Sequence, residues 1–202
     1  MRPMLVLTAL LTACGAPSPS EGAGKPAGAG ADIPAPPAVT QPEVAMAPLS
    51  LTSPAFAPGA EIPREYTCQG GDTSPELAWS GAPAGTRSFV LIEHDPDVPD
   101  PAAPQRQWVH WVLYDLPSDL TGLPKGAQVA PPGGRDGNSD WGKTGYGGPC
   151  PPIGRHRYFH TLYALDTVLG DRGPLTRDAL EAGIAGHVLA KAELIGTYQK
   201  SP

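Results

Sequence analysis

Residues 145–165 read GYGGPCPPIGRHRYFHTLYAL, and this stretch is the most informative part of the chain. Its first half is rich in glycine, which lets a backbone approach a ligand closely, and in proline, which fixes the backbone conformation. Its second half alternates polar and apolar residues, as is typical of a β-strand with one buried face. We therefore expect a rigid loop that leads into a strand and presents His156 and Tyr158 as one wall of a binding site.

Similar apolar runs predict further β-strands at residues 88–94, 107–114 and 189–197, with a weaker candidate at 77–79. The motif DPDVP at residues 95–99 is typical of a turn. One helix is expected after the N-cap residue Thr176, because Leu180, Ile184 and Val188 would form one apolar stripe. Many strands, few helices and proline-rich turns predict a mainly β fold, a sandwich with appended helices.

The N-terminus resembles the signal peptide of a bacterial lipoprotein. Residues 1–14 combine Arg2, a short apolar run and a lipobox that ends at Cys14, the expected lipidated N-terminus of the mature chain. The alternative is ordinary cleavage, which leaves Cys14 free or absent. Gly15 follows the cysteine where an aspartate would favour the inner membrane, so the resemblance implies an outer-membrane lipoprotein that faces the periplasm. Residues 15–47, rich in Ala, Gly, Pro and Ser, predict a disordered tether before a domain at 48–202.

Charge and cysteine content narrow the class of protein further. The net charge is −6 and there is no run of Lys or Arg, which argues against nucleic acid as a partner. No apolar run beyond the N-terminus is long enough to span a membrane. Cys68 and Cys150 are a candidate disulfide in an exported domain, and the alternative is a pair of buried free thiols.

Polar side chains recur on the expected strands in positions where they would gather. Successive strand residues point to opposite faces, so Trp108, His110 and Val112 should share one face. In the later strand the residues that should share a face are His156, Tyr158, His160 and Leu162. If these strand ends meet near Asp95, they form a small pocket with one carboxylate, two or three imidazoles and a phenol.

Several motifs, in order, carry a family resemblance. They are TCQG at 67–70, SPELAWSG at 74–81, DPDVP at 95–99, WVHW at 108–111, GGPCPPIGRHRYF at 147–159 and GHVLA at 186–190. Together they resemble the phosphatidylethanolamine-binding protein family, and in particular its bacterial and archaeal Raf-kinase-inhibitor-like branch. The resemblance covers roughly residues 51–198. It implies a sandwich of antiparallel sheets with a few peripheral helices, one of them near the C-terminus.

The resemblance also implies a pocket for phosphate, acetate or a phospholipid headgroup. An imidazole beside a carboxylate would be a charged donor, Tyr158 would add a hydroxyl donor, and Gly148 would offer a backbone N–H. Asp95 would orient a histidine or bind the ammonium of a headgroup, and Asp97 would brace its turn. His160 stands where the family usually has an aromatic residue, and it could support the pocket by adding polarity there. The favoured interpretation is a core histidine bonded to the backbone. The implied ligand residues are Asp95, Trp108, His110, Gly148, His156 and Tyr158.

These features predict a lipid-anchored binding protein for a small anion or phosphorylated ligand, and not an enzyme. Neither a cofactor nor a metal site is expected, since the histidines lack the close spacing of metal ligands. One alternative is an inhibitor or scaffold that acts on a protease or another protein partner. A second is a hydrolase-like enzyme that uses His, Asp and Tyr. A Cys150 nucleophile would need a free thiolate, which a disulfide to Cys68 would exclude.

Overall fold

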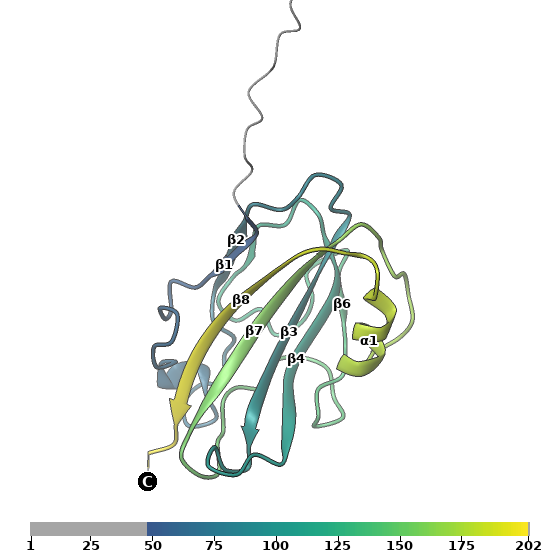
Figure 1. The fold of residues 1–202 in the computed structure, drawn as a ribbon. Coiled ribbons are helices and arrows are strands. Elements are labelled where there is room, and N and C mark those ends of the chain that lie inside the picture. The colour runs from purple at the N-terminus through teal and green to yellow at the C-terminus, as the bar shows by residue number, and fades with distance from the viewer. Residues whose placement is uncertain (1–47, 202) are drawn as a thin grey trace, which may run out of the picture. The chain divides into compact units, whose positions relative to one another are not determined.

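Four long antiparallel strands dominate the computed structural model, which describes residues 48–201. The expected signal peptide, the lipidation site Cys14 and the tether at 15–47 lie outside the described residues. The long strands and a short edge strand form a five-stranded sheet in the order β6-β4-β3-β7-β8 (Figure 1). These strands are β3 (Ser88–Val98), β4 (Arg106–Pro117), β6 (Arg135–Asp136), β7 (Arg155–Leu165) and β8 (Val188–Gln199).

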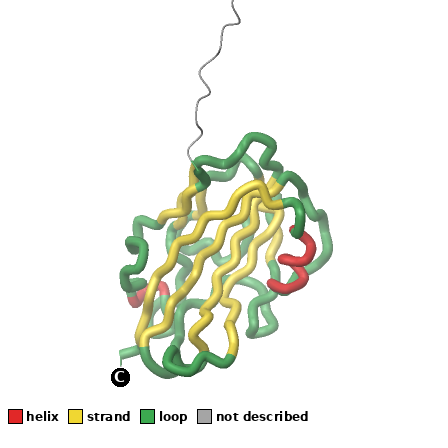
Figure 2. The backbone as a smooth tube through the Cα atoms, viewed as in Figure 1, coloured by secondary structure: helices red, strands yellow, loops and turns green. Residues whose placement is uncertain are grey.

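A second, smaller sheet packs on one face of the large sheet. Its strands, in the order β1-β2-β5, are Ser50–Thr52, Leu77–Ser80 and Gly122–Leu123. Leu51 and Trp79 of this sheet share one core with Phe89 and Leu91 of β3. Figure 2 shows the long strands side by side in the large sheet, with loops at both of their ends. The expected mainly β sandwich is confirmed.

Helix α1 (Arg177–Ile184) covers the opposite face of the large sheet, where its Leu180 and Ile184 pack against Val90 and other strand residues. The alternation of β3 between the two cores follows from the period of two in a strand. A three-residue 3-10 helix, η1 (Arg64–Tyr66), precedes β2. Within residues 48–201, no helix is long and apolar enough to cross a membrane.

The expected helix begins as predicted but ends earlier. Thr176 is the N-cap, and its side-chain oxygen accepts a hydrogen bond from the backbone N–H of Ala179 at 3.4 Å. The placement of Val188 on the helical stripe is wrong, because Gly186 turns the chain with a φ of +82° and Val188 is the first residue of β8. Its side chain is 42% exposed.

A β-bulge in β4 changes the expected face of one residue. Glu93 pairs with Trp111 and His94 with Val109, so His110 is an extra residue with no partner of its own in β3. Beyond the bulge, Trp111 packs in the core under the small sheet and Val112 packs on the helix side. The prediction that Val112 shares a face with His110 is therefore wrong.

The expected turn at residues 95–99 is also wrong in part. Strand β3 continues to Val98, since Asp95 pairs with Trp108 and Val98 with Arg106. The register shifts between these two pairs, and Pro96 lies in the shift. Proline lacks the N–H of a regular ladder, so a register shift is one of the few places in a sheet that accepts it. This extension carries Asp95 and Asp97 on a strand rather than in a loop.

Candidate functional site

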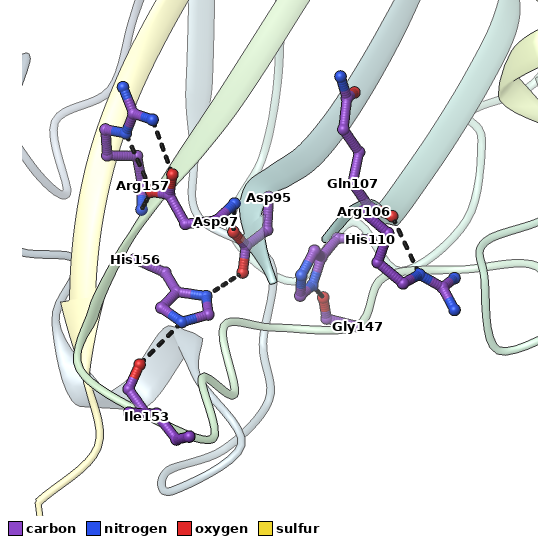
Figure 3. Close-up of polar contacts among 9 residues, drawn as sticks. All are labelled: Asp95, Asp97, Arg106, Gln107, His110, Gly147, Ile153, His156 and Arg157. Atoms are coloured by element: carbon purple, nitrogen blue, oxygen red, sulfur yellow. Dashed lines mark hydrogen bonds and ion pairs between the residues drawn. The ribbon is translucent and has the colours of Figure 1, made fainter. Parts of the chain in front are cut away.

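A cavity of about 300 Å³ lies where β3 and β4 meet the loop that precedes β7. Three of the six expected ligand residues line it, namely Asp95, Trp108 and His110. The other lining residues are Val98, Trp141, Cys150 and Pro152. The remaining expected residues, Gly148, His156 and Tyr158, are buried and do not line the cavity. Figure 3 shows the polar contacts of Asp95, His110 and neighbouring residues.

His110 is the titratable base of the cavity. Its Nδ1 lies 2.7 Å from the carbonyl oxygen of Gly147, and because a carbonyl only accepts, Nδ1 carries the proton and donates (Figure 3). Burial lowers the pKa of His110, so the ring is neutral near neutral pH. The second nitrogen, Nε2, has no hydrogen-bond partner among residues 48–201 and is the ring atom left for a ligand.

Asp95 and His156 form a buried pair next to the cavity. His156 Nδ1 lies 2.7 Å from Asp95 Oδ2, and its Nε2 lies 2.9 Å from the carbonyl oxygen of Ile153 (Figure 3). The other carboxylate oxygen of Asp95 accepts the backbone N–H of Asp97 at 2.8 Å. Both ring nitrogens of His156 thus face oxygen acceptors within the protein, so this histidine orients Asp95 and leaves no nitrogen for a ligand.

Asp97 braces the end of β3 against β7, as the sequence suggested. Its carboxylate accepts hydrogen bonds from Arg157, from Nη2 at 2.7 Å and from both Nε and the backbone N–H at 2.9 Å (Figure 3). The Arg157 hydrogen bond lowers the pKa of Asp97, which keeps the carboxylate ionised. Because Asp97 is two residues from Asp95, this bidentate pair also fixes the strand end that carries Asp95.

Tyr158 lies beside His110 in the core. The two rings meet edge to face, with centroids 5.3 Å apart. The hydroxyl is buried and has no hydrogen-bond partner in the part of the chain that the structure describes. Burial and the nearby Asp95 charge raise the pKa of Tyr158, so the phenol remains a proton donor. Tyr158 does not line the cavity, so the structure places its hydroxyl near His110 but not on the cavity wall.

Gly148 has a different role from the expected one. Its backbone N–H already donates to Asp72 Oδ1 at 2.7 Å, so the donor expected for an anion is engaged. A Cβ at this position would lie 2.4 Å from the carbonyl oxygen of Tyr66, so only glycine fits. Gly147 contributes to the site instead, through the carbonyl oxygen that holds His110.

His160 lies in the core and not in the cavity, opposite a glutamate that sequence reasoning missed. His160 Nε2 and Glu93 Oε2 are 3.5 Å apart, and both side chains are fully buried. The expected core position is correct, and the backbone of Tyr158 and Leu194 lies near the ring, but neither ring nitrogen reaches full hydrogen-bond geometry with a described residue. Burial lowers the pKa of His160 to about 4 and raises that of Glu93 well above its usual range. The alternation of side chains along β3 places Glu93 on the same face as Phe89 and Leu91, so the sequence pattern alone could have indicated that Glu93 is buried.

The expected disulfide is present. Cys68 and Cys150 are bonded, with Cα atoms 5.4 Å apart, and they are separated by 82 positions in the sequence. The backbone N–H of Cys68 also donates to the carbonyl oxygen of Pro149 at 3.2 Å. The bond fixes the cavity loop to the segment after η1 and removes the free thiolate that a Cys150 nucleophile would need.

Trp141 was also missed by sequence reasoning, although it lines the cavity. Its ring meets Trp108 at 5.5 Å and His110 at 5.1 Å, both nearly perpendicular. It lies in the irregular segment between β6 and β7, where no periodicity indicates which way a side chain points. Its neighbours Trp108 and His110 were found because they lie on a strand.

Comparisons with known proteins agree with this fold. The model of the family described as phosphatidylethanolamine-binding protein matches residues 52–199. A UPF0098 protein of Chlamydia pneumoniae is 45% identical over 153 residues, which are 76% of this chain and all of the relative. A UPF0098 protein of Methanothermobacter thermautotrophicus is 46% identical over 156 residues, which are 75% of this chain and 99% of the relative.

Two solved structures have the same fold. One is a phosphatidylethanolamine-binding protein homologue from Chlamydia trachomatis, with a TM-score of 0.71 and 42% identity, which covers 76% of this chain and 99% of the homologue. The other is YbcL of Escherichia coli, with a TM-score of 0.69 and 30% identity, which covers 77% of this chain and all of YbcL. The motifs, the fold and these relatives agree, and the chain belongs to the phosphatidylethanolamine-binding protein family.

Proposed function

We propose that this protein binds a small ligand through an anionic group, such as a phosphate, a carboxylate or a phospholipid headgroup, in the cavity beside His110. The observation that carries the proposal is the arrangement of His110. Its Nδ1 is committed to Gly147, and its Nε2 is free on a side chain that lines the cavity. A single ring nitrogen with a fixed orientation suits one directed contact to a ligand oxygen.

Binding of an anion requires a proton at His110. The neutral ring presents a lone pair at Nε2, which repels an oxyanion, whereas the imidazolium donates a charge-assisted hydrogen bond. An anion placed near the ring favours the charged form and offsets the effect of burial. We infer that the ligand and one proton bind together, or that the ligand brings the proton itself, as a phosphate monoanion does.

The same contacts favour binding over catalysis. A general acid–base mechanism needs a second positioned group within reach of the reacting atoms. His156 has both nitrogens engaged, each oxygen of Asp95 already accepts a hydrogen bond, and Cys150 is held in a disulfide. His110 alone has a free titratable atom on the cavity, which supports a binding site more than an active site.

We further propose that the protein is exported and anchored to the outer membrane through Cys14, facing the periplasm. The signal-like segment at residues 1–14 supports this, and so does the disulfide, because disulfides persist in oxidising compartments. Metabolic labelling with a fatty-acid analogue tests the anchor. Loss of the label on Cys14→Ser is the expected result, and a fully labelled variant would overturn it.

Isothermal titration calorimetry with inorganic phosphate and phosphoethanolamine tests the binding proposal. His110→Gln should abolish binding of both ligands, since it removes the imidazolium donor at similar size. His187→Gln is the matched control, because His187 is a surface histidine paired with Asp166, with both side chains 47% exposed. Binding that survives His110→Gln unchanged would refute the assigned site.

A further inference from the structure

Hydrogen bonds within the loop at residues 139–143, and from this loop to β4, fix the position of Trp141 beside the cavity. Ser139 closes the loop with two hydrogen bonds to the carbonyl oxygen of Lys143, from its N–H at 2.9 Å and its hydroxyl at 2.8 Å. Asp140 joins the loop to β4: its N–H donates to the carbonyl oxygen of Val109 at 3.0 Å, and its carboxylate accepts the Val109 N–H at 2.9 Å. The residue after Asp140 is therefore held next to His110.

Gly147 provides the space that the Trp141 ring occupies. A Cβ at Gly147 would lie 2.5 Å from Trp141 Cζ3, so any side chain there would displace the indole. The same glycine holds His110 through its carbonyl oxygen. Trp141 nevertheless remains 42% exposed as a residue, so it forms a wall that is partly open to solvent and is not a buried core residue.

The two tryptophans make an aromatic corner, which we define as the indoles of Trp108 and Trp141. Their rings are 5.5 Å apart and inclined at 71°. Trp141 also stands at 82° to the His110 ring, 5.1 Å away. Two inclined aromatic faces beside one polar atom present apolar surface to whatever part of a ligand extends from His110.

Apolar surface dominates the cavity as a whole. Among its seven lining residues, Asp95 and His110 carry the ionisable groups, and the two indole N–H groups are the other side-chain donors. The remaining walls are the aromatic corner, Val98, Pro152 and the sulfur-bearing Cys150. A bare inorganic anion would leave these walls without a partner, whereas a ligand with an apolar body would bury surface against them.

We propose that Trp141 is a specificity-determining residue, and that the aromatic corner selects a phosphomonoester with an apolar body over inorganic phosphate. The inference rests on the proposed function, since it takes the charged group to lie at His110. The ligand class follows from the cavity: one anionic end for the polar residues and a compact hydrocarbon or aryl group for the corner. Trp141 then contributes through the body of the ligand and not through the phosphate.

Calorimetric titration with inorganic phosphate and phenyl phosphate separates anion binding at His110 from selection of the ligand body by the aromatic corner. The wild-type chain should bind phenyl phosphate at least ~10-fold more tightly than phosphate, as expected for burial of an aryl ring. Trp141→Ala should lose ~10-fold or more for phenyl phosphate but no more than ~3-fold for phosphate, and Trp141→Phe should restore most of the preference. Val168→Ala is the control, because Val168 is also an exposed apolar residue, 47% exposed, beyond the far end of β7.

Each outcome has a distinct meaning. A wild-type chain that binds phosphate with no gain for phenyl phosphate overturns the role of the aromatic corner and leaves the proposed function intact. An equal loss for both ligands in Trp141→Ala also overturns it, because Trp141 would then only maintain the site. A wild-type chain that binds neither ligand overturns the proposed function and this inference with it.

Discussion

His156 Nδ1 lies 2.7 Å from Asp95 Oδ2 across the boundary between β7 and β3, and both side chains are buried. On the other side of the ring, His156 Nε2 contacts the carbonyl oxygen of Ile153, so the ring is held at both nitrogens. It therefore fixes Asp95 and the loop end at once, although neither ring nitrogen of His156 is left for a ligand. His156 is a positioning residue of the site.

Removal of His156 should destabilise the fold strongly. His156→Ala leaves the buried Asp95 carboxylate without its side-chain hydrogen-bond donor, which typically costs ~1–3 kcal/mol of unfolding free energy or more. Urea unfolding followed by circular dichroism measures the loss. His187→Ala is the control: it removes a similar His–Asp contact of 2.8 Å on the surface and should change stability by less than ~1 kcal/mol. Equal effects of the two variants would contradict a structural role for the buried pair.

Ligand binding should take up a proton at His110. Burial lowers the pKa of this ring in the free protein, and a bound anion raises it. The affinity for a fully ionised anion is then greatest at low pH and falls as pH rises from the pKa of the free protein toward the higher pKa of the bound state, by at most ~10-fold per pH unit. Calorimetry in buffers of different ionisation enthalpy measures the proton uptake directly. An affinity that is independent of pH with no proton uptake would contradict this coupling.

Glu93 should make the protein less stable as pH rises. Its folded pKa is raised well above the usual value by burial, so its contribution is fully present below the unfolded pKa of ~4.3 and is lost as pH increases toward the folded pKa. Glu93→Gln removes the titrating group at the same size. We expect the variant to be more stable than wild type at neutral pH. Its free energy of unfolding should no longer fall as pH rises, which urea unfolding across a pH series measures.

His160 gives a separate signal in the same experiment. Its folded pKa is lowered to about 4, so it reduces stability as pH falls from its ordinary value of ~6.5 toward 4. Glu93→Gln should not change this loss of stability at acidic pH. Glu61→Gln, at a carboxylate that is 57% exposed and paired with Arg155, should reproduce the wild-type profile. An identical profile for Glu93→Gln would show that Glu93 does not titrate as described.

Loss of the disulfide should weaken both the fold and the site. The bond closes a loop of 82 positions, for which chain entropy predicts a stabilisation of about 4–5 kcal/mol. The double variant Cys68→Ser with Cys150→Ser should unfold at lower temperature and bind phosphate more weakly, because Gly147 in the same loop holds His110. Thermal unfolding and calorimetry test the two effects. Wild-type affinity in a destabilised variant would show that the loop keeps its position without the bond.

The long strands were predictable because a period of two leaves a clear pattern in sequence, as in residues 88–94 and 157–165. The bulge at His110 was not, since it arises from pairing with β3 and leaves the apolar pattern of β4 unbroken. The bond between Gly148 and Asp72 joins positions 76 residues apart, and no local pattern reports it. Family motifs indicated the strand residues of the site, but they assigned no role to Trp141 in its irregular loop.

The disulfide also sets an order of events in the life of the chain. Cys150 is at once part of the cavity wall and half of the link to Cys68. The disulfide in this wall forms and persists in oxidising compartments. A newly made chain in a reducing environment would hold an unfinished cavity, so oxidation would precede ligand capture. Maturation of the cysteines would thereby determine when, and in which compartment, the protein first becomes able to retain what it binds.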